Sequence, residues 1–179
     1  GVLHCDVKPA NILMLHDGDG ILADFGLARL TGSMDDTESG VSSGTPSYMS
    51  PEQVNAEKPG PGTDQYALAV IAYQLLCGVL PFTGKTVFQV MTAHVEQEPA
   101  PPSSHEPRLP AAADSVILRG LAKSPGDRWD SCAGFVHALL EALRQPAAAA
   151  PPPPSQPATS LPGDSSWRPA GWQPEEWSD

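Results

Sequence analysis

Hydrophobic positions follow a helical period through the middle of the chain. The stretch from Ala67 to Phe82 is apolar on nearly every face and is interrupted at Gln74. It predicts a helix that begins near Thr63, ends at Gly78 and lies at the centre of a core. Later apolar positions recur at i, i+3 and i+4, which predicts amphipathic helices around that centre, over residues 87–95, 117–122 and 135–143.

Two short apolar runs near the start have a different pattern. Residues 12–15 and 21–23 flank a polar segment, 16–20, that contains Asp-Gly pairs. Asp-Gly favours a tight turn, so the runs predict a β-hairpin between Asn11 and Asp24. Residues 31–47 contain almost no large apolar side chain, and they cannot bury enough surface to offset the cost of ordering. A loop is expected there.

The composition changes abruptly at Pro146, beyond which Ala, Pro and Ser dominate. The proline run 151–154 favours extended polyproline geometry without a packed core. We therefore expect two parts: a folded domain over 1–145 and a disordered Pro/Ala-rich tail over 146–179. Tryptophans at 167, 172 and 177 share no single helical face, so a linker is the simpler interpretation and docking to a partner is the alternative.

Composition and charge exclude several classes of protein. The chain has 179 residues, 40% of them hydrophobic, which is enough for one core. Its net charge of −11 argues against nucleic acid as a partner. The 67–82 stretch is shorter than the roughly 20 residues that cross a bilayer. Three scattered cysteines match no disulfide or metal pattern, which favours the cytoplasm. The start at Gly1, without Met or a signal pattern, suggests a piece of a longer protein.

Candidate chemistry lies in three short motifs. They are His-Cys-Asp-Val-Lys-Pro-Ala-Asn at 4–11, Asp-Phe-Gly at 24–26 and Ser-Pro-Glu at 50–52. In this order the motifs resemble those of the protein kinases, in particular the bacterial serine/threonine branch, and the resemblance covers residues 1 to about 145. It implies an α+β fold: a protein-kinase-like C-lobe, mainly α-helical with a short β-hairpin, with the N-lobe absent. It also implies transfer of the ATP γ-phosphate to Ser/Thr hydroxyls of protein substrates, with Mg²⁺.

The resemblance assigns a role to each motif residue. Phosphoryl transfer needs positioning of the hydroxyl and neutralisation of phosphate charge. By resemblance, Asp6 orients the substrate hydroxyl and accepts its proton, while Lys8 contacts the transferring phosphate and indicates serine/threonine specificity. Asn11 and Asp24 offer oxygen ligands to Mg²⁺ and, with Lys8, would hold the nucleotide phosphates.

Structural roles are also implied. The segment that contains the 4–11 motif is called the catalytic loop below. His4 would tie this loop to the hairpin, and Phe25 would pack beneath the site. Glu52 would form a buried ion pair with Arg128, and Asp64 would accept backbone donors of the catalytic loop. The resemblance gives structural roles to two further positions, Gly26 and Thr45.

The chain departs from the family at Cys5, where the family usually has arginine. A thiol cannot pair with phosphate as a guanidinium does. The activation segment, 24–52, holds four candidate phosphoacceptors, Thr37, Ser39, Ser42 and Ser43, beside acidic residues at 35, 36 and 38. We expect that activity does not strictly require phosphorylation of this loop.

The larger departure concerns the nucleotide-binding half. The given sequence has no Gly-rich loop, no strand lysine and no helix before His4, so we expect that it does not encode the adenine site. We expect a kinase as the parent protein, no turnover by this stretch alone, and partial exposure of residues 67–76. Two alternatives stay open: a noncatalytic kinase-like binding module, supported by Cys5 and the missing half, and a scaffold that acts through the tail.

Overall fold

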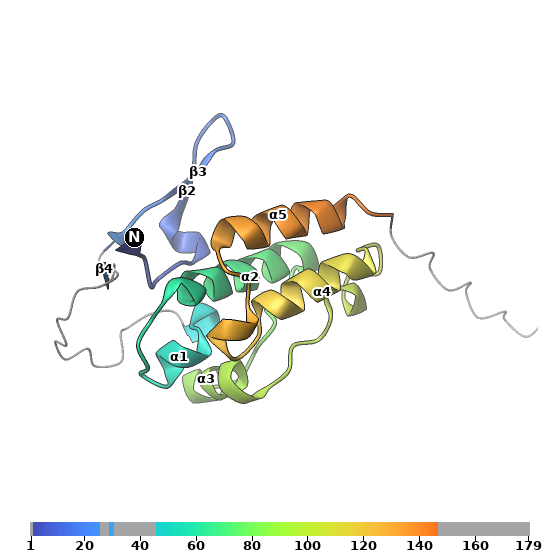
Figure 1. The fold of residues 1–179 in the computed structure, drawn as a ribbon. Coiled ribbons are helices and arrows are strands. Elements are labelled where there is room, and N and C mark those ends of the chain that lie inside the picture. Colours follow the sequence, from blue (N-terminus) through green and yellow to red (C-terminus); the bar gives the residue numbers. More distant parts are fainter. Residues whose placement is uncertain (1, 26–28, 31–45, 147–179) are drawn as a thin grey trace, which may run out of the picture.

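The computed structural model describes residues 2–25, 29–30 and 46–146, in which a helical body lies beside a projecting hairpin (Figure 1). The helices are α1 (Pro51–Val54), α2 (Pro61–Cys77), α3 (Val87–Glu96), α4 (Ala111–Gly120) and α5 (Cys132–Leu143). The strands are β1 (Val2–Leu3), β2 (Ile12–Met14), β3 (Gly20–Leu22) and β4 (Arg29–Leu30). This confirms the predicted α+β fold class. The tail from 147, Gly26, Thr45 and the four candidate phosphoacceptors lie outside the described residues.

Helix α2 forms the centre of the core, as predicted. Pro61 occupies its first turn, where a missing N–H costs nothing, and Gly78 ends it in the left-handed conformation at φ 72°. Its buried side chains include Tyr66, Val70 and Tyr73. They pack against Ile117 of α4 and Phe135 of α5 in one core cluster. No helix within the described ranges has the length and hydropathy needed to span a membrane.

Helices α4 and α5 lie side by side and both pack on α2 (Figure 1). The three helices approach one another closely at Gly120, where an added Cβ would lie 2.9 Å from the Cβ of Ala69 and 3.1 Å from the ring of Phe135. Side-chain caps begin the flanking helices: Thr86 accepts from Gln89 N–H at α3, and Ser131 accepts from Gly134 N–H at α5. The predicted segments 87–95 and 135–143 lie in α3 and α5. The predicted segment 117–122 is helical only to Gly120, because α4 spans Ala111–Gly120 and Leu121 and Ala122 lie beyond its end.

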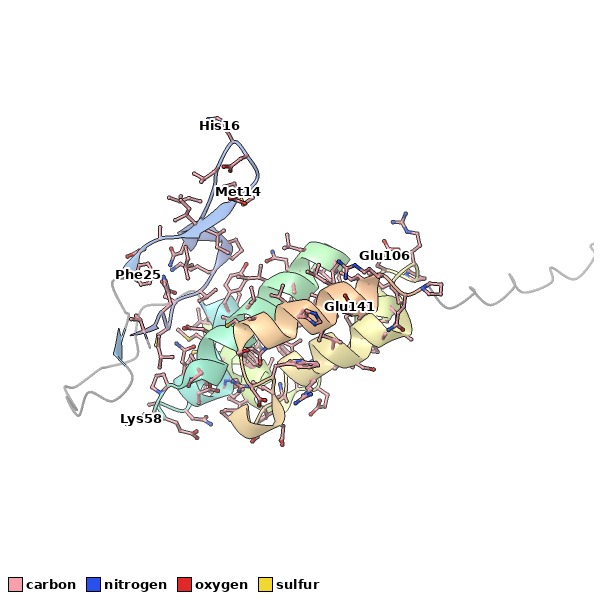
Figure 2. The ribbon with its side chains drawn as sticks, turned by 45° about the horizontal axis from the view of Figure 1, so that its top comes forward. Met14, His16, Phe25, Lys58, Glu106 and Glu141 are labelled. Atoms are coloured by element: carbon pink, nitrogen blue, oxygen red, sulfur yellow. The ribbon has the colours of Figure 1, made fainter. Side chains whose placement is uncertain are left out.

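The predicted hairpin is formed by β2 and β3. Ile12 pairs with Leu22 and Met14 with Gly20, and Gly18 at φ 92° supports the turn between the strands. Figure 2 shows Met14 and His16 on the hairpin, away from the helices. The base of the hairpin, through Ile12 and Leu22, packs against a cluster that α2 shares with the catalytic loop.

That packing limits the exposure expected along residues 67–76. Ala67 and Ile71 are buried beneath the hairpin base, whereas Leu75 is 80% exposed. Other exposed apolar side chains lie on the hairpin itself, including Leu13 and Met14. The hairpin base therefore covers Ala67 and Ile71, while Leu68 and Ala72 stay partly exposed and Leu75 is the most exposed position of residues 67–76.

A second strand pair was not predicted. β1 and β4 run antiparallel, with Val2 opposite Leu30 and Leu3 opposite Arg29. Two-residue strands are too short to leave an alternating pattern, so the sequence carries no signal for this pairing.

Candidate active site

The catalytic loop is attached to the first turn of α2. The Asp64 carboxylate accepts the backbone N–H of His4 through Oδ2 and that of Cys5 through Oδ1, both at 2.8 Å. Asp64 therefore receives backbone donors of the loop, as the resemblance implied. The rigid central helix fixes the position of the loop through this carboxylate.

Cys5 has a left-handed backbone at φ 61°, a conformation that is strained for a residue with a Cβ. Its N–H is held by Asp64 from α2, and its carbonyl oxygen accepts from Gln53 Nε2 on α1 at 2.7 Å. Both backbone polar groups of Cys5 are therefore bound by side chains from other elements. These contacts maintain the turn that leads directly into Asp6.

Three of the predicted site residues form one cluster. Lys8 Nζ lies 2.7 Å from Asp6 Oδ2, and Asn11 Nδ2 donates to Asp6 Oδ2 at 3.1 Å. Asn11 Nδ2 also donates to the backbone oxygen of Asp6 at 2.8 Å. Asn11 is buried, and the side chains of Asp6 and Lys8 are partly exposed. A carboxylate oxygen is thus held between an ammonium and an amide at the surface of the lobe.

Asp24 follows strand β3 closely, and its neighbour Ala23 contacts the catalytic loop. The N–H of Ala23 donates to the carbonyl oxygen of Asn11 at 2.8 Å, and the ring Nε2 of His4 lies 3.0 Å from the oxygen of Ala23. His4 thereby ties the loop to the hairpin. Asp24 itself has φ 63°, the second left-handed residue of the site.

Phe25 contacts the loop less completely than expected. Its ring centroid lies 4.8 Å from that of His4 at a tilted angle, yet the residue is 56% exposed. Phe25 therefore packs on one side only and does not form a closed floor beneath the site.

The donor set suits a hard divalent cation. Asn11 provides an amide oxygen and Asp24 a carboxylate, the ligand types that Mg²⁺ accepts together with water and phosphate oxygens. Because Asn11 Nδ2 donates to Asp6, the amide oxygen would be the atom that faces a cation. The described part of the chain contains no group of three or more His, Cys, Asp or Glu side chains that could hold a metal ion.

A buried ion pair joins α1 to the far side of the lobe. Arg128 donates through both terminal nitrogens to the Glu52 carboxylate, at 2.9 and 2.7 Å, and Thr63 Oγ1 donates to it at 2.8 Å. Burial raises the pKa of Glu52, but the hydrogen bonds and charge of Arg128 outweigh this, and the net pKa lies below the ordinary 4.5. The ion pair expected from the resemblance is present in the structure.

The motifs do not single out Gln53, which contacts the catalytic loop. The signal that marks it is local: Ser50 and Gln53 have the Ser-x-x-Gln spacing of a capping box, and both capping bonds are present at α1. That pattern predicts a helix start, but it gives no information about the second bond of the glutamine to Cys5.

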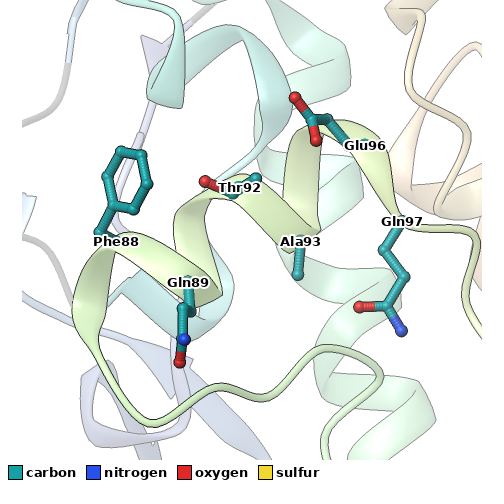
Figure 3. A pocket seen from close by; sticks show the side chains of 6 residues that line it. All are labelled: Phe88, Gln89, Thr92, Ala93, Glu96 and Gln97. Atoms are coloured by element: carbon teal, nitrogen blue, oxygen red, sulfur yellow. The ribbon is translucent and has the colours of Figure 1, made fainter.

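A hollow of about 350 Å³ lies elsewhere, along α3 (Figure 3). It is lined by Phe88, Gln89, Thr92, Ala93, Glu96 and Gln97. None of these residues belongs to the three motifs, so the hollow is separate from the Asp6 cluster.

The Asp–Lys–Asn cluster, the hairpin that follows it and the attachment of the loop to a buried central helix agree with the C-terminal lobe that the resemblance implied. Comparison with known families agrees: the protein kinase domain family matches residues 1–141. The chain therefore belongs to the protein kinase family.

Its relatives are bacterial serine/threonine kinases. Serine/threonine-protein kinase Pkn1 of Myxococcus xanthus is 43% identical over 150 residues, which cover 81% of this chain and 22% of the relative. Serine/threonine-protein kinase PknH of Mycobacterium tuberculosis is 37% identical, with 82% and 23% covered. The crystal structure of a mutant form of the M. tuberculosis PknI kinase domain is similar at TM-score 0.57 and 33% identity, with 78% of this chain and 46% of that chain covered. The chain spans about a quarter of the length of the curated relatives it matches.

Proposed function

We propose that the protein is an ATP-dependent serine/threonine protein kinase and that this chain supplies its catalytic loop, its metal ligands and its substrate-side lobe. The observation that carries the proposal is the cluster in which Asp6 Oδ2 lies 2.7 Å from Lys8 Nζ and 3.1 Å from Asn11 Nδ2. This cluster presents a carboxylate and a cation side by side, as transfer of a phosphoryl group to a hydroxyl requires.

Each group has a distinct task in the proposed reaction. Asp6 orients the acceptor hydroxyl and takes up its proton, and the contact with Asn11 fixes the direction of the carboxylate. Lys8 neutralises charge on the transferring phosphate. Asn11 and Asp24 hold Mg²⁺, which screens the phosphate oxygens of ATP when bound.

The remaining assignments extend this proposal to the whole chain. We assign residues 1–145 to the catalytic domain and 146–179 to a tail, for which a linker is the simpler role and docking to a partner is the alternative. The net charge of −11 argues against nucleic acid as that partner, and the three scattered cysteines favour a cytoplasmic location.

The proposal is tested on the intact protein with γ-labelled ATP, Mg²⁺ and myelin basic protein as acceptor. Asp6→Asn should lower kcat by roughly 10²- to 10⁴-fold, the range for loss of a general base. Asp17→Asn is the matched control, because Asp17 is an exposed acid on the hairpin turn. Chelation of Mg²⁺ should abolish transfer. An intact protein that binds ATP but transfers no phosphate would favour the noncatalytic binding module instead.

A further inference from the structure

The side chain of Gln53 joins two segments that lie 48 positions apart in the chain. Its Oε1 accepts from Ser50 N–H at 3.1 Å and lies 3.2 Å from Ser50 Oγ, while its Nε2 donates to the Cys5 carbonyl oxygen at 2.7 Å. An amide has an acceptor at one end and donors at the other, so these partners determine its orientation. Reversing the amide would place donor against donor at Ser50 and acceptor against acceptor at Cys5.

The carbonyl that Gln53 binds belongs to the peptide group between Cys5 and Asp6. On the other side of the same peptide, the N–H of Asp6 donates to His4 Nδ1 at 3.3 Å. The preceding backbone at Cys5 is in the left-handed region, which an L-residue leaves readily unless other contacts hold it. Gln53 therefore acts on the peptide plane from which the Asp6 side chain extends.

We propose that Gln53 is a positioning residue for catalysis: its single amide both caps α1 and clamps the Cys5–Asp6 peptide, so that the end of the activation segment is coupled to the catalytic loop. This inference rests on the proposed kinase function and adds a residue that acts through Asp6. The position of Gln53 explains why the coupling occurs at the end of the activation segment. Helix α1, which contains Gln53, begins at Pro51, directly after Ser50 of the Ser-Pro-Glu motif.

The two tasks of Gln53 need opposite chemical groups, so they can be separated by substitution. The cap at Ser50 needs an acceptor, whereas the clamp at Cys5 needs a donor. Gln53→Glu keeps the acceptor and is itself a favoured capping residue, but it turns a carboxylate oxygen toward the Cys5 carbonyl. Gln53→Lys has the reverse effect, because it keeps a donor and loses the acceptor.

The experiment measures kcat and KM of the intact kinase for ATP and for myelin basic protein. We expect Gln53→Glu to lose on the order of tenfold or more in kcat, the effect of a misplaced catalytic group, with little change in KM for ATP. Gln53→Lys should retain more of the wild-type kcat than Gln53→Glu. If capping alone mattered, the order of the two variants would be reversed, and that order or a kcat of Gln53→Glu within twofold of wild type would overturn the inference.

Gln89→Glu is the matched control. Gln89 occupies the same N-terminal position of α3, after Thr86, and its Oε1 accepts from Lys85 N–H at 2.8 Å. The same substitution there should leave kcat unchanged, because α3 does not hold the Cys5–Asp6 peptide.

A second measurement does not depend on activity. Amide hydrogen exchange in residues 4–8 should be faster in Gln53→Glu than in the wild type, and equal exchange would overturn the clamp. If the wild-type protein transfers no phosphate, the proposed function fails, while the exchange comparison still decides whether Gln53 holds the loop.

Discussion

Two residues of the candidate site have left-handed backbones although each has a Cβ. They are Cys5, at φ 61°, and Asp24, at φ 63°. Each such conformation costs on the order of 1 to 3 kcal/mol and persists only where other contacts hold it. At Cys5 those contacts are two hydrogen bonds. Its N–H donates to the Asp64 carboxylate, and its carbonyl oxygen accepts from Gln53 Nε2. The strain at Cys5 therefore lies where the chain turns sharply into Asp6, the proposed catalytic residue.

The ion pair between Glu52 and Arg128 allows a test at the same scale. Arg128→Met leaves the Glu52 carboxylate buried without its partner, so the free energy of unfolding of the intact protein should fall by roughly 3 to 5 kcal/mol. Denaturant unfolding measures the loss. Arg108→Met is the control, because Arg108 pairs with Glu106 at an exposed position and should change little. Similar losses in the two variants would contradict the importance of burial.

At the scale of the elements, α3 is joined to α2 by a buried polar contact. His94 is fully buried, and its Nδ1 lies 2.9 Å from the hydroxyl oxygen of Tyr66. Its ring also stacks at a tilted angle on Phe82, 4.7 Å away, and Lys123 donates to its carbonyl oxygen. Helix α3 is thus held by a neutral imidazole in the middle of the core.

This contact makes stability depend on pH. Burial and then the charge of Lys123 lower the pKa of His94 from 6.5 to about 4. Well above pH 6.5 the ring is neutral in both states. As pH falls from 6.5 towards 4, only the unfolded chain gains a proton at this residue, so the free energy of unfolding should fall by up to about 1.4 kcal/mol per pH unit.

The measurement is the slope of unfolding free energy against pH between 4 and 6.5. His94→Gln should flatten that slope, whatever it does to absolute stability. His16→Gln, at the exposed hairpin turn, should leave the slope unchanged. Parallel curves for the wild type and His94→Gln would show that another group is responsible.

On the scale of the whole molecule, the catalytic loop is positioned by the helical lobe through side chains. Asp64 from α2 and Gln53 from α1 bind its backbone, and His4 links it to the hairpin. No arginine stands at position 5 to receive an activating phosphate. We therefore expect these contacts to hold the loop in place without phosphorylation of the activation segment.

The corresponding prediction concerns the activation segment. Replacing its four candidate acceptors, Thr37, Ser39, Ser42 and Ser43, with Ala in the intact kinase should leave most of the activity toward myelin basic protein. The measurement is the initial rate of phosphate transfer, compared with that of Asp6→Asn as the inactive reference. A collapse of the rate to that reference would reject the prediction.

Local sequence was sufficient wherever the physical cause is local. Helix α2 ends at Gly78 because glycine accepts the left-handed conformation, and the hairpin forms where Asp-Gly pairs separate two apolar runs. The resemblance to the protein kinases indicated Asp6, Lys8, Asn11 and Asp24, and the structure gathers the first three into one cluster.

Tertiary structure alone decided contacts between distant positions. The sequence does not show that Gln53 reaches Cys5, that Cys5 is left-handed, or that β1 pairs with β4. Periodicity reports which face of an element is apolar, but it does not report which distant group a polar side chain meets. That choice is made when the helices pack, because a buried donor or acceptor must find its partner among whatever groups the packing brings near.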